Sequence, residues 1–202
     1  MIFVRQSSVK LWRRCRQAYY YKEVEGIEKK TTPIALKRGT ILHKCIEAFY
    51  NKDDWKQVIF EFKKEYDKLM EEEKEYYGDL PRECHRIMTG YVNLYGRLKE
   101  RALAVELDFS DNPIEVFPGI YLKGKIDMIL RDKKGTWVVE HKSHKKIPSE
   151  SDRFLDLQTA IYVTVAEKLG YKIDGVLWDY LRTKPPTIPE VLVSGKGISK
   201  NK

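Results

Sequence analysis

The sequence lacks the features of a membrane protein, of a disulfide-stabilised secreted protein and of a helicase. No run among its 202 residues approaches the roughly 18 uncharged apolar residues that cross a bilayer, and the N-terminus has no charged flank before an apolar stretch of signal-peptide length. The three cysteines are odd in number and widely spaced, which fits neither a disulfide framework nor a paired-thiol metal site. The phosphate-binding pattern Gly-x-x-x-x-Gly-Lys-Ser/Thr is absent. We therefore expect a cytoplasmic protein with reduced thiols, no membrane contact and no helicase motor.

The composition is that of a folded soluble protein with basic ends. Hydrophobic residues make up 42% of the chain and aromatic residues 12%, which excludes wholesale disorder and fibrous classes. The net charge of +8 is uneven: residues 1–38 hold 10 basic and 3 acidic side chains and residues 182–202 hold 5 and 1, whereas residues 51–80 hold 6 and 10. Basic ends attract polyanions, of which nucleic acid is the commonest. Solubilising lysines are an alternative of about equal weight.

The first half of the chain has the apolar periodicity of helices. Four helices are predicted, from Ser7 to about Gly26, from Thr32 through Phe49, from Asp53 to about Glu75 and from about Pro81 to Ala104. The second is the best marked, because Pro33 suits the first helical position and an apolar stripe follows at Leu42, Cys45, Ile46 and Phe49. The first half is therefore expected to be mainly helical.

After Ala104 the pattern changes to short segments rich in β-branched and aromatic residues. Strands are predicted at Val105 to Phe109, Tyr121 to Leu130, Thr136 to Ser143 and Gly175 to Leu181, with a helix over residues 153–169. The order strand, helix, strand predicts a right-handed parallel unit. We expect a single α/β domain over residues 1–202, with a helical segment (1–104), an α/β core (105–182) and a basic extended tail (183–202).

Two of the predicted strands form a hairpin that carries facing carboxylates. The link Asp132-Lys133-Lys134-Gly135 has the composition of a tight turn. Pairing that is symmetric about this turn places Asp127 opposite Glu140, and a bulge at Gly135 would shift the register by one residue. Because facing carboxylates repel, a positive charge is expected between them. Lys142 supplies one and a hard divalent cation supplies the rest; an exposed, salt-bridged hairpin is the alternative.

The motifs around these residues resemble those of a known nuclease family. Gly124-Lys125-Ile126-Asp127, Glu140-His141-Lys142 and Gln158-Thr159-Ala160-Ile161-Tyr162 stand on a predicted strand, strand and helix, an order that resembles the core of the PD-(D/E)XK nuclease superfamily. The RecB-like branch, which includes phage recombination exonucleases and CRISPR-associated nucleases, is the most similar. Ile126 stands where the superfamily's name has proline, as is usual in that branch. The resemblance implies a restriction-endonuclease-like core, with a mixed β-sheet and a crossover helix, preceded by a helical N-terminal segment.

The N-terminal half adds to the resemblance, which covers residues 7 to about 182. Gly39-Thr40-Ile41-Leu42-His43 is similar to the branch's Gly-Thr-x-x-His, which provides a metal-binding histidine. Glu106 stands where the branch often has an acidic residue. Some members bind an iron–sulfur cluster through one N-terminal and three C-terminal cysteines. Because no cysteine follows Cys84, no iron–sulfur cluster is expected.

The resemblance implies a deoxyribonuclease that depends on Mg²⁺ or Mn²⁺. It implies metal ligation by His43, Asp127, Glu140 and the backbone carbonyl of His141, and a catalytic Lys142 that orients the attacking water. Gln158 and Tyr162, which lie four residues apart on one helix face, are implied to position the water or the nucleic-acid backbone. Phosphate contacts are expected from the basic residues Arg13, Arg14, Arg16, Lys37, Arg38, Lys145 and Lys146.

Three functions remain open on the sequence. One is a DNA exonuclease of recombination or repair, phage-encoded and acting in the cytoplasm of a bacterial host. The others are a structure-specific endonuclease with the same site and a catalytically silent fold that binds nucleic acid or a partner protein. Because the Asp, Glu, Lys and His positions are all filled, the sequence favours an active enzyme. Single- or double-stranded DNA is the expected partner; a recombination protein and a second copy of the chain are also open.

Overall fold

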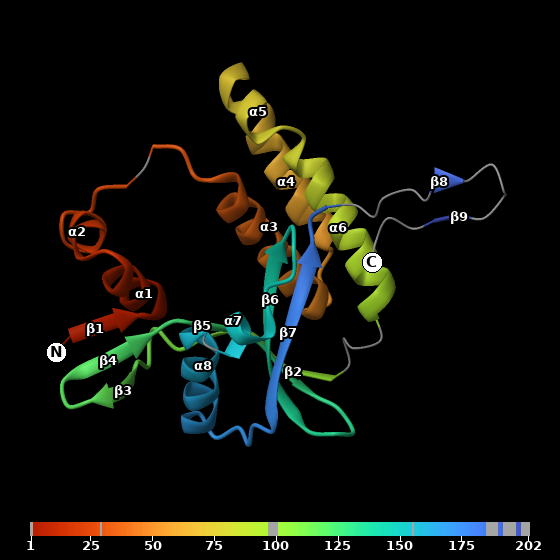
Figure 1. Ribbon diagram of the computed structural model, residues 1–202. Coiled ribbons are helices and arrows are strands. Elements are labelled where there is room, and N and C mark those ends of the chain that lie inside the picture. Colours follow the sequence, from red (N-terminus) through yellow and green to blue (C-terminus); the bar gives the residue numbers. More distant parts are fainter. Residues whose placement is uncertain are drawn as a thin grey trace.

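A four-stranded mixed sheet forms the centre of the protein (Figure 1). The computed structural model describes residues 2–28, 30–96, 101–154, 156–184, 190–191 and 197–198. The strand order is β2-β5-β6-β7, with bounds β2 (Ala102–Asp108), β5 (Lys125–Arg131), β6 (Thr136–His144) and β7 (Gly175–Arg182). β2 and β6 run antiparallel to β5, whereas β6 and β7 are parallel. Between β6 and β7 the chain forms α7 (Glu150–Phe154) and α8 (Leu157–Lys168), which confirms the predicted mixed sheet and crossover helix.

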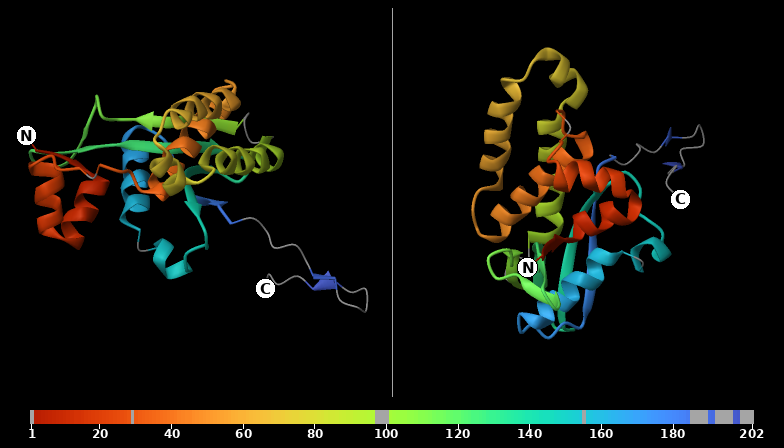
Figure 2. Two further views of the ribbon diagram at one scale, coloured as in Figure 1. Left: turned by 90° about the horizontal axis from the view of Figure 1, so that it is seen from above. Right: turned by 90° about the vertical axis from the view of Figure 1, so that its left-hand side faces the viewer.

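Helices cover both faces of this sheet (Figure 2). One face is covered by helices from the first half of the chain, α3 (Ile34–Tyr50) and α6 (Leu80–Tyr95). The helix α4 (Trp55–Asp67) packs against both of them, and α5 (Glu71–Tyr77) lies beyond the sheet at the end of α4 (Figure 1). The predicted stripe of α3 is fully buried there and packs in one cluster with Met128 and Val139 of the sheet. On the other face Ile129 and Val138 pack against Val165 and Ala166 of α8. The α/β fold class is thereby confirmed.

Several helix boundaries differ from the prediction. The first helix starts at Gln6, directly after β1 (Ile2–Arg5), and is divided into α1 (Gln6–Arg14), α2 (Arg16–Tyr19) and a π-helix η1 (Tyr20–Val24). The break is at Cys15, whose backbone is extended, with φ −161° and ψ 109°. The predicted third helix is divided into α4 and α5. The Tyr66 hydroxyl at the end of α4 donates to the carbonyls of Lys74 and Gly78 and so holds α5 against α4. No helix in the described part of the chain is both long and apolar enough to cross a membrane.

The second half also contains elements that were not predicted. The fourth helix ends at Tyr95 and β2 begins at Ala102, so its predicted extension to Ala104 was wrong. A second, three-stranded sheet joins β1 to β4 (Ile120–Lys123) in parallel and β4 to β3 (Ile114–Phe117) in antiparallel fashion. Most of the predicted tail (183–202) lies outside the described residues. Within it, β8 (Glu190–Val191) pairs antiparallel with β9 (Gly197–Ile198), and the division into 1–104, 105–182 and 183–202 stays a prediction.

The β5–β6 hairpin has the predicted register. Met128 pairs with Val139 and Arg131 with Thr136, so the paired residues do not have the shifted register that a bulge at Gly135 would give. Gly135 itself has φ +158°, and a Cβ atom there would lie 2.6 Å from Oδ2 of Asp174. The turn therefore needs glycine, and the unshifted register continues to Asp127 opposite Glu140.

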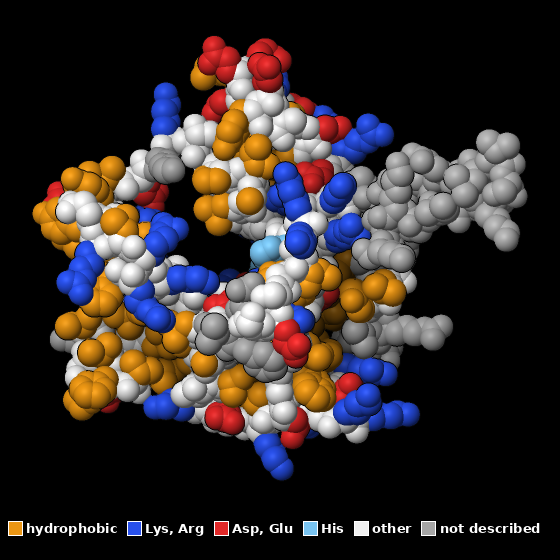
Figure 3. Space-filling model, viewed as in Figure 1, with side chains coloured by type: hydrophobic (Ala, Val, Ile, Leu, Met, Phe, Trp, Pro, Cys, Tyr) orange, Lys and Arg blue, Asp and Glu red, His pale blue; other side chains and the backbone are white. Residues whose placement is uncertain are grey.

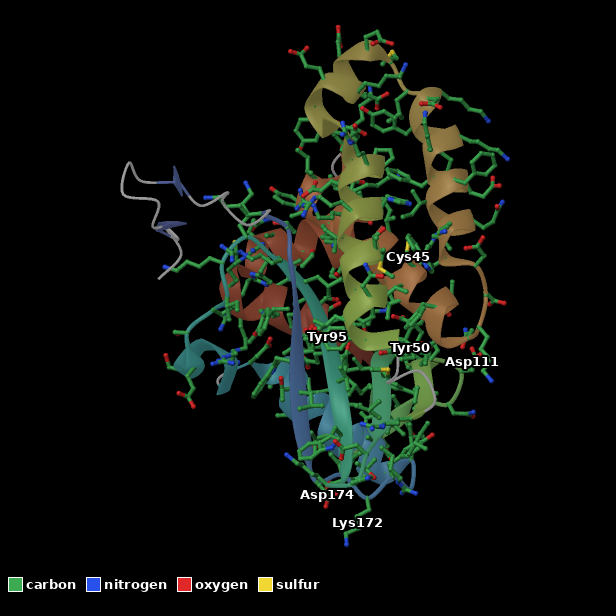
Figure 4. The ribbon with its side chains drawn as sticks, turned by 90° about the vertical axis from the view of Figure 1, so that its right-hand side faces the viewer. Cys45, Tyr50, Tyr95, Asp111, Lys172 and Asp174 are labelled. Atoms are coloured by element: carbon green, nitrogen blue, oxygen red, sulfur yellow. The ribbon has the colours of Figure 1, made fainter. Side chains whose placement is uncertain are left out.

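The three cysteines differ sharply in exposure, and this predicts their reactivity. Cys45 of α3 (labelled in Figure 4) and Cys84 of α6 are fully buried, and burial raises the pKa of both thiols to about 12. Cys15 is exposed and all three thiols are free. Because thiolate is the reactive form, native protein should react rapidly with one equivalent of N-ethylmaleimide and denatured protein with three, as counted by intact-protein mass. Rapid labelling of a Cys15→Ser variant would contradict this.

Candidate active site

Three carboxylates lie side by side on adjacent strands. The β2–β5 register aligns Val105 with Met128 and Leu107 with Ile126, so Glu106 lies opposite Asp127. The β5–β6 register continues to Glu140 on the other side of Asp127. Glu106 has a φ of +47°, a left-handed conformation that is uncommon for a residue other than glycine and that often occurs at functional sites.

His43 of α3 completes a cluster with two of these carboxylates. Its Nδ1 lies 3.1 Å from Glu106 Oε1 and 3.8 Å from Asp127 Oδ1, and its Nε2 lies 3.1 Å from the backbone carbonyl of His141. One potential ligand atom from each of His43, Glu106 and Asp127 lies within 4.8 Å of the others. Both ring nitrogens thus face oxygen acceptors. Although burial opposes protonation, the Glu106 hydrogen bond and the Asp127 charge raise the pKa of His43, so the cluster attracts positive charge.

The carboxylates of Asp127 and Glu140 are buried, and the positive charges near them do not compensate for the loss of solvent. Asp127 is 8% exposed and Glu140 is 0% exposed, and burial raises the pKa of both. Asp127 Oδ2 accepts a 2.8 Å hydrogen bond from the backbone N–H of His141. Glu140 Oε2 is buried and has no hydrogen-bond partner among the described residues. Its ion pair with Lys142, at 3.3 Å, offsets only part of the charge. This oxygen-rich donor set suits a hard divalent cation.

Lys142 joins this cluster to the start of α8. Its Nζ donates to Gln158 Oε1 at 2.8 Å and lies 3.3 Å from both Glu140 Oε2 and Asp156 Oδ2. Burial lowers the pKa of Lys142, but the charges of Glu140 and Asp156 outweigh burial and raise it. Gln158 Nε2 in turn donates to the Tyr162 hydroxyl at 3.1 Å. The structure therefore brings Glu140, Lys142, Gln158 and Tyr162 into one network beside Asp127.

Sequence analysis missed three residues of this network. The Thr159 hydroxyl donates to Glu140 Oε1 at 3.2 Å, and Trp178 Nε1 of β7 donates to Thr159 at 3.1 Å. Asp156 contacts Lys142 and accepts from the backbone N–H of Gln158 as the N-cap of α8. Because the predicted helix began at Arg153, Asp156 was placed inside a helix and not at its N-cap. An N-cap search would have found Asp156, whereas contacts to Thr159 and Trp178 depend on the packing of α8 on the sheet.

The His141 side chain lies on the face of the strand opposite to Glu140, as expected for a residue that alternates with it, and its ring lies 6.2 Å from that of His43 in an edge-on arrangement. It is buried on the opposite face, where Nδ1 lies 3.0 Å from Asp179 Oδ2 of β7 and the ring lies 6.0 Å from that of Tyr91. The backbone carbonyl and N–H of His141 make its hydrogen-bond contacts with the cluster. His141 therefore contributes main-chain groups to the site.

The predicted nucleic-acid contacts fall into two groups. Arg13 and Arg14 line a pocket of about 810 Å³ beside α1, and Lys145 and Lys146 are exposed just after β6. Lys and Arg side chains also gather over α1 and α2 in the space-filling view (Figure 3). These exposed residues are placed where a polyanion can reach them.

The remaining residues predicted to contact phosphates interact with other side chains of the protein. Arg38 is only 9% exposed and its guanidinium pairs with Glu83 at 3.0 Å, so a phosphate would have to compete with this carboxylate. The Lys37 ammonium lies 5.5 Å from the centre of the Phe62 ring. The exposed Arg16 lies over Trp12 at 4.8 Å, which leaves its guanidinium edge open to a phosphate.

Comparison with models of known families gives a match over nearly the whole chain. Residues 5–195 match the PD-(D/E)XK nuclease superfamily, whose members are nucleic-acid hydrolases that use divalent metals. The match spans both His43 on α3 and the strands that carry Asp127 and Glu140. A search of curated proteins finds no match. With a mixed sheet, a crossover helix and this cluster in place, the chain belongs to the PD-(D/E)XK nuclease superfamily.

Proposed function

We propose that the protein is a Mg²⁺- or Mn²⁺-dependent deoxyribonuclease, a RecB-like exonuclease of DNA recombination or repair. The observation that carries the proposal is the cluster of His43, Glu106 and Asp127, with Lys142 and the buried Glu140 paired on the adjacent strand. The motifs Gly124 to Asp127, Glu140 to Lys142 and Gln158 to Tyr162 support the RecB-like branch, in which phage recombination exonucleases occur. DNA is the proposed partner, and a recombination protein is a candidate second one.

The cation would be held by His43, Glu106 and Asp127, whose ligand atoms lie together. The backbone carbonyl of His141, which faces the other ring nitrogen of His43, is proposed as a ligand on the family resemblance. Glu106 joins the ligand set expected from the sequence, because its carboxylate lies in the cluster with His43. Glu140 is proposed as a further ligand through Oε2, the oxygen without a hydrogen bond. A divalent cation bound there lowers the pKa of a coordinated water and offsets phosphate charge.

The chain's own residues supply the remaining steps of phosphodiester hydrolysis. Lys142 holds the attacking water with its ammonium group and stabilises the negative charge that develops on the phosphate. Gln158 fixes Lys142 by accepting a hydrogen bond, and the Tyr162 hydroxyl fixes Gln158. Arg13, Arg14 and the lysines after β6 hold the strand by contacts to its phosphates, which are independent of sequence.

A cleavage assay with two DNA topologies tests this proposal. End-labelled linear DNA and covalently closed circles are incubated with Mg²⁺, Mn²⁺ or EDTA. We expect degradation of linear DNA only, dependent on metal, because an exonuclease needs an end. Cleavage of circles would identify an endonuclease with the same site. Failure to cleave DNA or RNA with any divalent metal would contradict the nuclease function, and product lengths from single- and double-stranded substrates give the polarity.

A further inference from the structure

Asp156 lies between two lysines that belong to different parts of the site. Its Oδ2 is 3.3 Å from Nζ of Lys142, next to the carboxylate cluster. Its Oδ1 is 3.5 Å from Nζ of Lys10 on α1 and accepts a 3.1 Å hydrogen bond from the backbone N–H of Gln158. The Asp156 side chain is 15% exposed, whereas that of Lys10 is 65% exposed. One carboxylate therefore contacts both a half-buried lysine of the site and an exposed one.

The Lys10 side of Asp156 faces a basic pocket. The pocket, about 810 Å³ in volume, lies between α1, η1 and the start of α8, and its lining includes four basic residues and the carboxylates of Asp156 and Glu23; the basic residues are Lys10, Arg13, Arg14 and Lys22. In Figure 3 a hollow separates the part of the molecule that carries α1 and α2 from α3. Such a pocket suits a nucleic-acid backbone, but a carboxylate in its wall repels phosphates. Strand binding therefore does not explain why a carboxylate occupies this position.

The contacts of Lys142 explain the position of the Asp156 carboxylate. An ammonium group has three N–H donors, and Nζ of Lys142 has three oxygen neighbours, from Glu140, Gln158 and Asp156. Two of these come from the first turn of α8, which Asp156 itself caps. Without the Asp156 carboxylate, the ammonium loses one of its two ionic partners and gains freedom to rotate.

We propose that Asp156 is a positioning residue that fixes the ammonium of Lys142 for phosphodiester hydrolysis, at a cost in affinity for the nucleic-acid strand in the α1 pocket. This inference rests on the proposed nuclease function. A positioning role and a purely structural role predict opposite changes in strand binding. If Asp156 positions Lys142, loss of the carboxylate should slow turnover and strengthen strand binding. Damage to the fold would weaken both.

The test uses two substitutions that keep the helix cap. Asn and Ser are both good N-cap residues, so Asp156→Asn and Asp156→Ser should preserve α8, and the Ser side chain is too short to reach Lys142. We expect kcat on the cleaved substrate to fall by about 10- to 100-fold, the range for a misplaced catalytic group. The Kd for a labelled oligonucleotide in EDTA should fall, and an unchanged Kd would overturn the cost in affinity; the rise in melting temperature on addition of Mn²⁺ should be unchanged.

Two control variants separate the two lysine contacts from the cap. Asp54→Asn makes the same change at the N-cap of α4, where Oδ1 accepts a hydrogen bond from the backbone N–H of Lys56, and should leave kcat and Kd unchanged. Lys10→Ala should raise Kd, because it removes a positive charge from the wall of the α1 pocket and leaves the contact between Asp156 and Lys142 in place.

The outcomes distinguish this inference from the proposed function. An active wild-type enzyme with unchanged kcat in both Asp156 variants overturns the positioning role alone. A parallel loss of kcat, affinity and melting temperature also overturns it, because that pattern indicates structural damage. A wild-type protein that cleaves no nucleic acid with any divalent metal overturns the proposed function, and the positioning role with it.

Discussion

Replacing Lys142 with Ala is expected to lower the rate of cleavage by about 10³-fold or more under saturating metal, because it removes the ammonium group that stabilises charge on the reacting phosphate. The group is charged throughout the neutral range, since Glu140 and Asp156 raise its pKa despite burial. Metal binding should survive, because the cluster of His43, Glu106 and Asp127 does not include Lys142. We therefore expect the Lys142→Ala variant to bind metal and nucleic acid and to cleave very slowly.

The same substitution has a cost in stability that the assay must separate from chemistry. Glu140 is fully buried, and removing one partner of a buried ion pair typically costs about 3–5 kcal/mol. Thermal melting with and without Mn²⁺ measures this cost, since a bound cation compensates part of the lost charge. Lys142→Arg keeps a positive charge with a different shape; it should melt near the wild-type temperature and still cleave poorly.

A second lysine beside the cluster provides the matched control. The Lys125 ammonium lies 3.6 Å from Glu106 Oε2, and its side chain is 43% exposed against 22% for Lys142. Lys125→Ala removes a solvated charge and should change the cleavage rate by less than about tenfold. Single-turnover rates at saturating metal give the comparison. Equal losses in the two variants would mean that general electrostatics, and not a positioned Lys142, accelerates the reaction.

The parts of the fold that the sequence predicted are those set by local patterns. The period of 3.6 residues places Leu42 and Phe49 in the core, and a turn with glycine where a Cβ would collide fixed the hairpin register. The breaks depend on contacts that no local pattern contains. The Tyr66 hydroxyl reaches across to Gly78, and β1 forms only because β4, more than 100 residues later, pairs with it. Such long-range partners override helical propensity.

The candidate site divides in the same way. Asp127, Glu140 and Lys142 could be placed together because strand alternation and hairpin symmetry determine their neighbours. The proximity of His43 to them came only from a motif, since no local rule joins α3 to β6. Glu106 is the informative case: its position opposite Asp127 depends on a β2–β5 pairing, and its φ of +47° turns its carboxylate to His43. Sequence alone ranked it as an additional acidic residue, whereas the structure includes it in the cluster.

Replacing Asp127 with Asn is expected to abolish cleavage and to stabilise the metal-free protein. The substitution removes a carboxylate from the group that also contains His43 and Glu106, so the Mn²⁺-induced rise in melting temperature should disappear and cleavage should fall by about 10³-fold or more. The amide oxygen of Asn can still accept the hydrogen bond from the backbone N–H of His141. Local structure should therefore be retained.

The stability gain follows from the raised pKa of Asp127. Burial is its main cause and the charge of Glu106 adds to it, against the opposing effects of His43 and His141. In the window between the ordinary value of 3.8 and the raised one, the folded state binds more protons than the unfolded state. The contribution of Asp127 to stability therefore falls as pH rises through this window. Asn has no proton to lose, so the variant should melt about 2–4 °C higher in EDTA near neutral pH, with a smaller difference in acid.

Asp132 offers a control of opposite sign. It lies in the exposed hairpin turn, where hydrogen bonds from Trp137 Nε1 and the turn's backbone N–H groups lower its pKa. This carboxylate stabilises the fold above its unfolded pKa, and the stabilisation is lost as pH falls through the lowered value. Asp132→Asn should therefore melt lower than wild type near neutral pH and cleave normally. If Asp127→Asn instead melts lower than wild type in EDTA and keeps its Mn²⁺ response, Asp127 is a structural residue and the metal is held elsewhere.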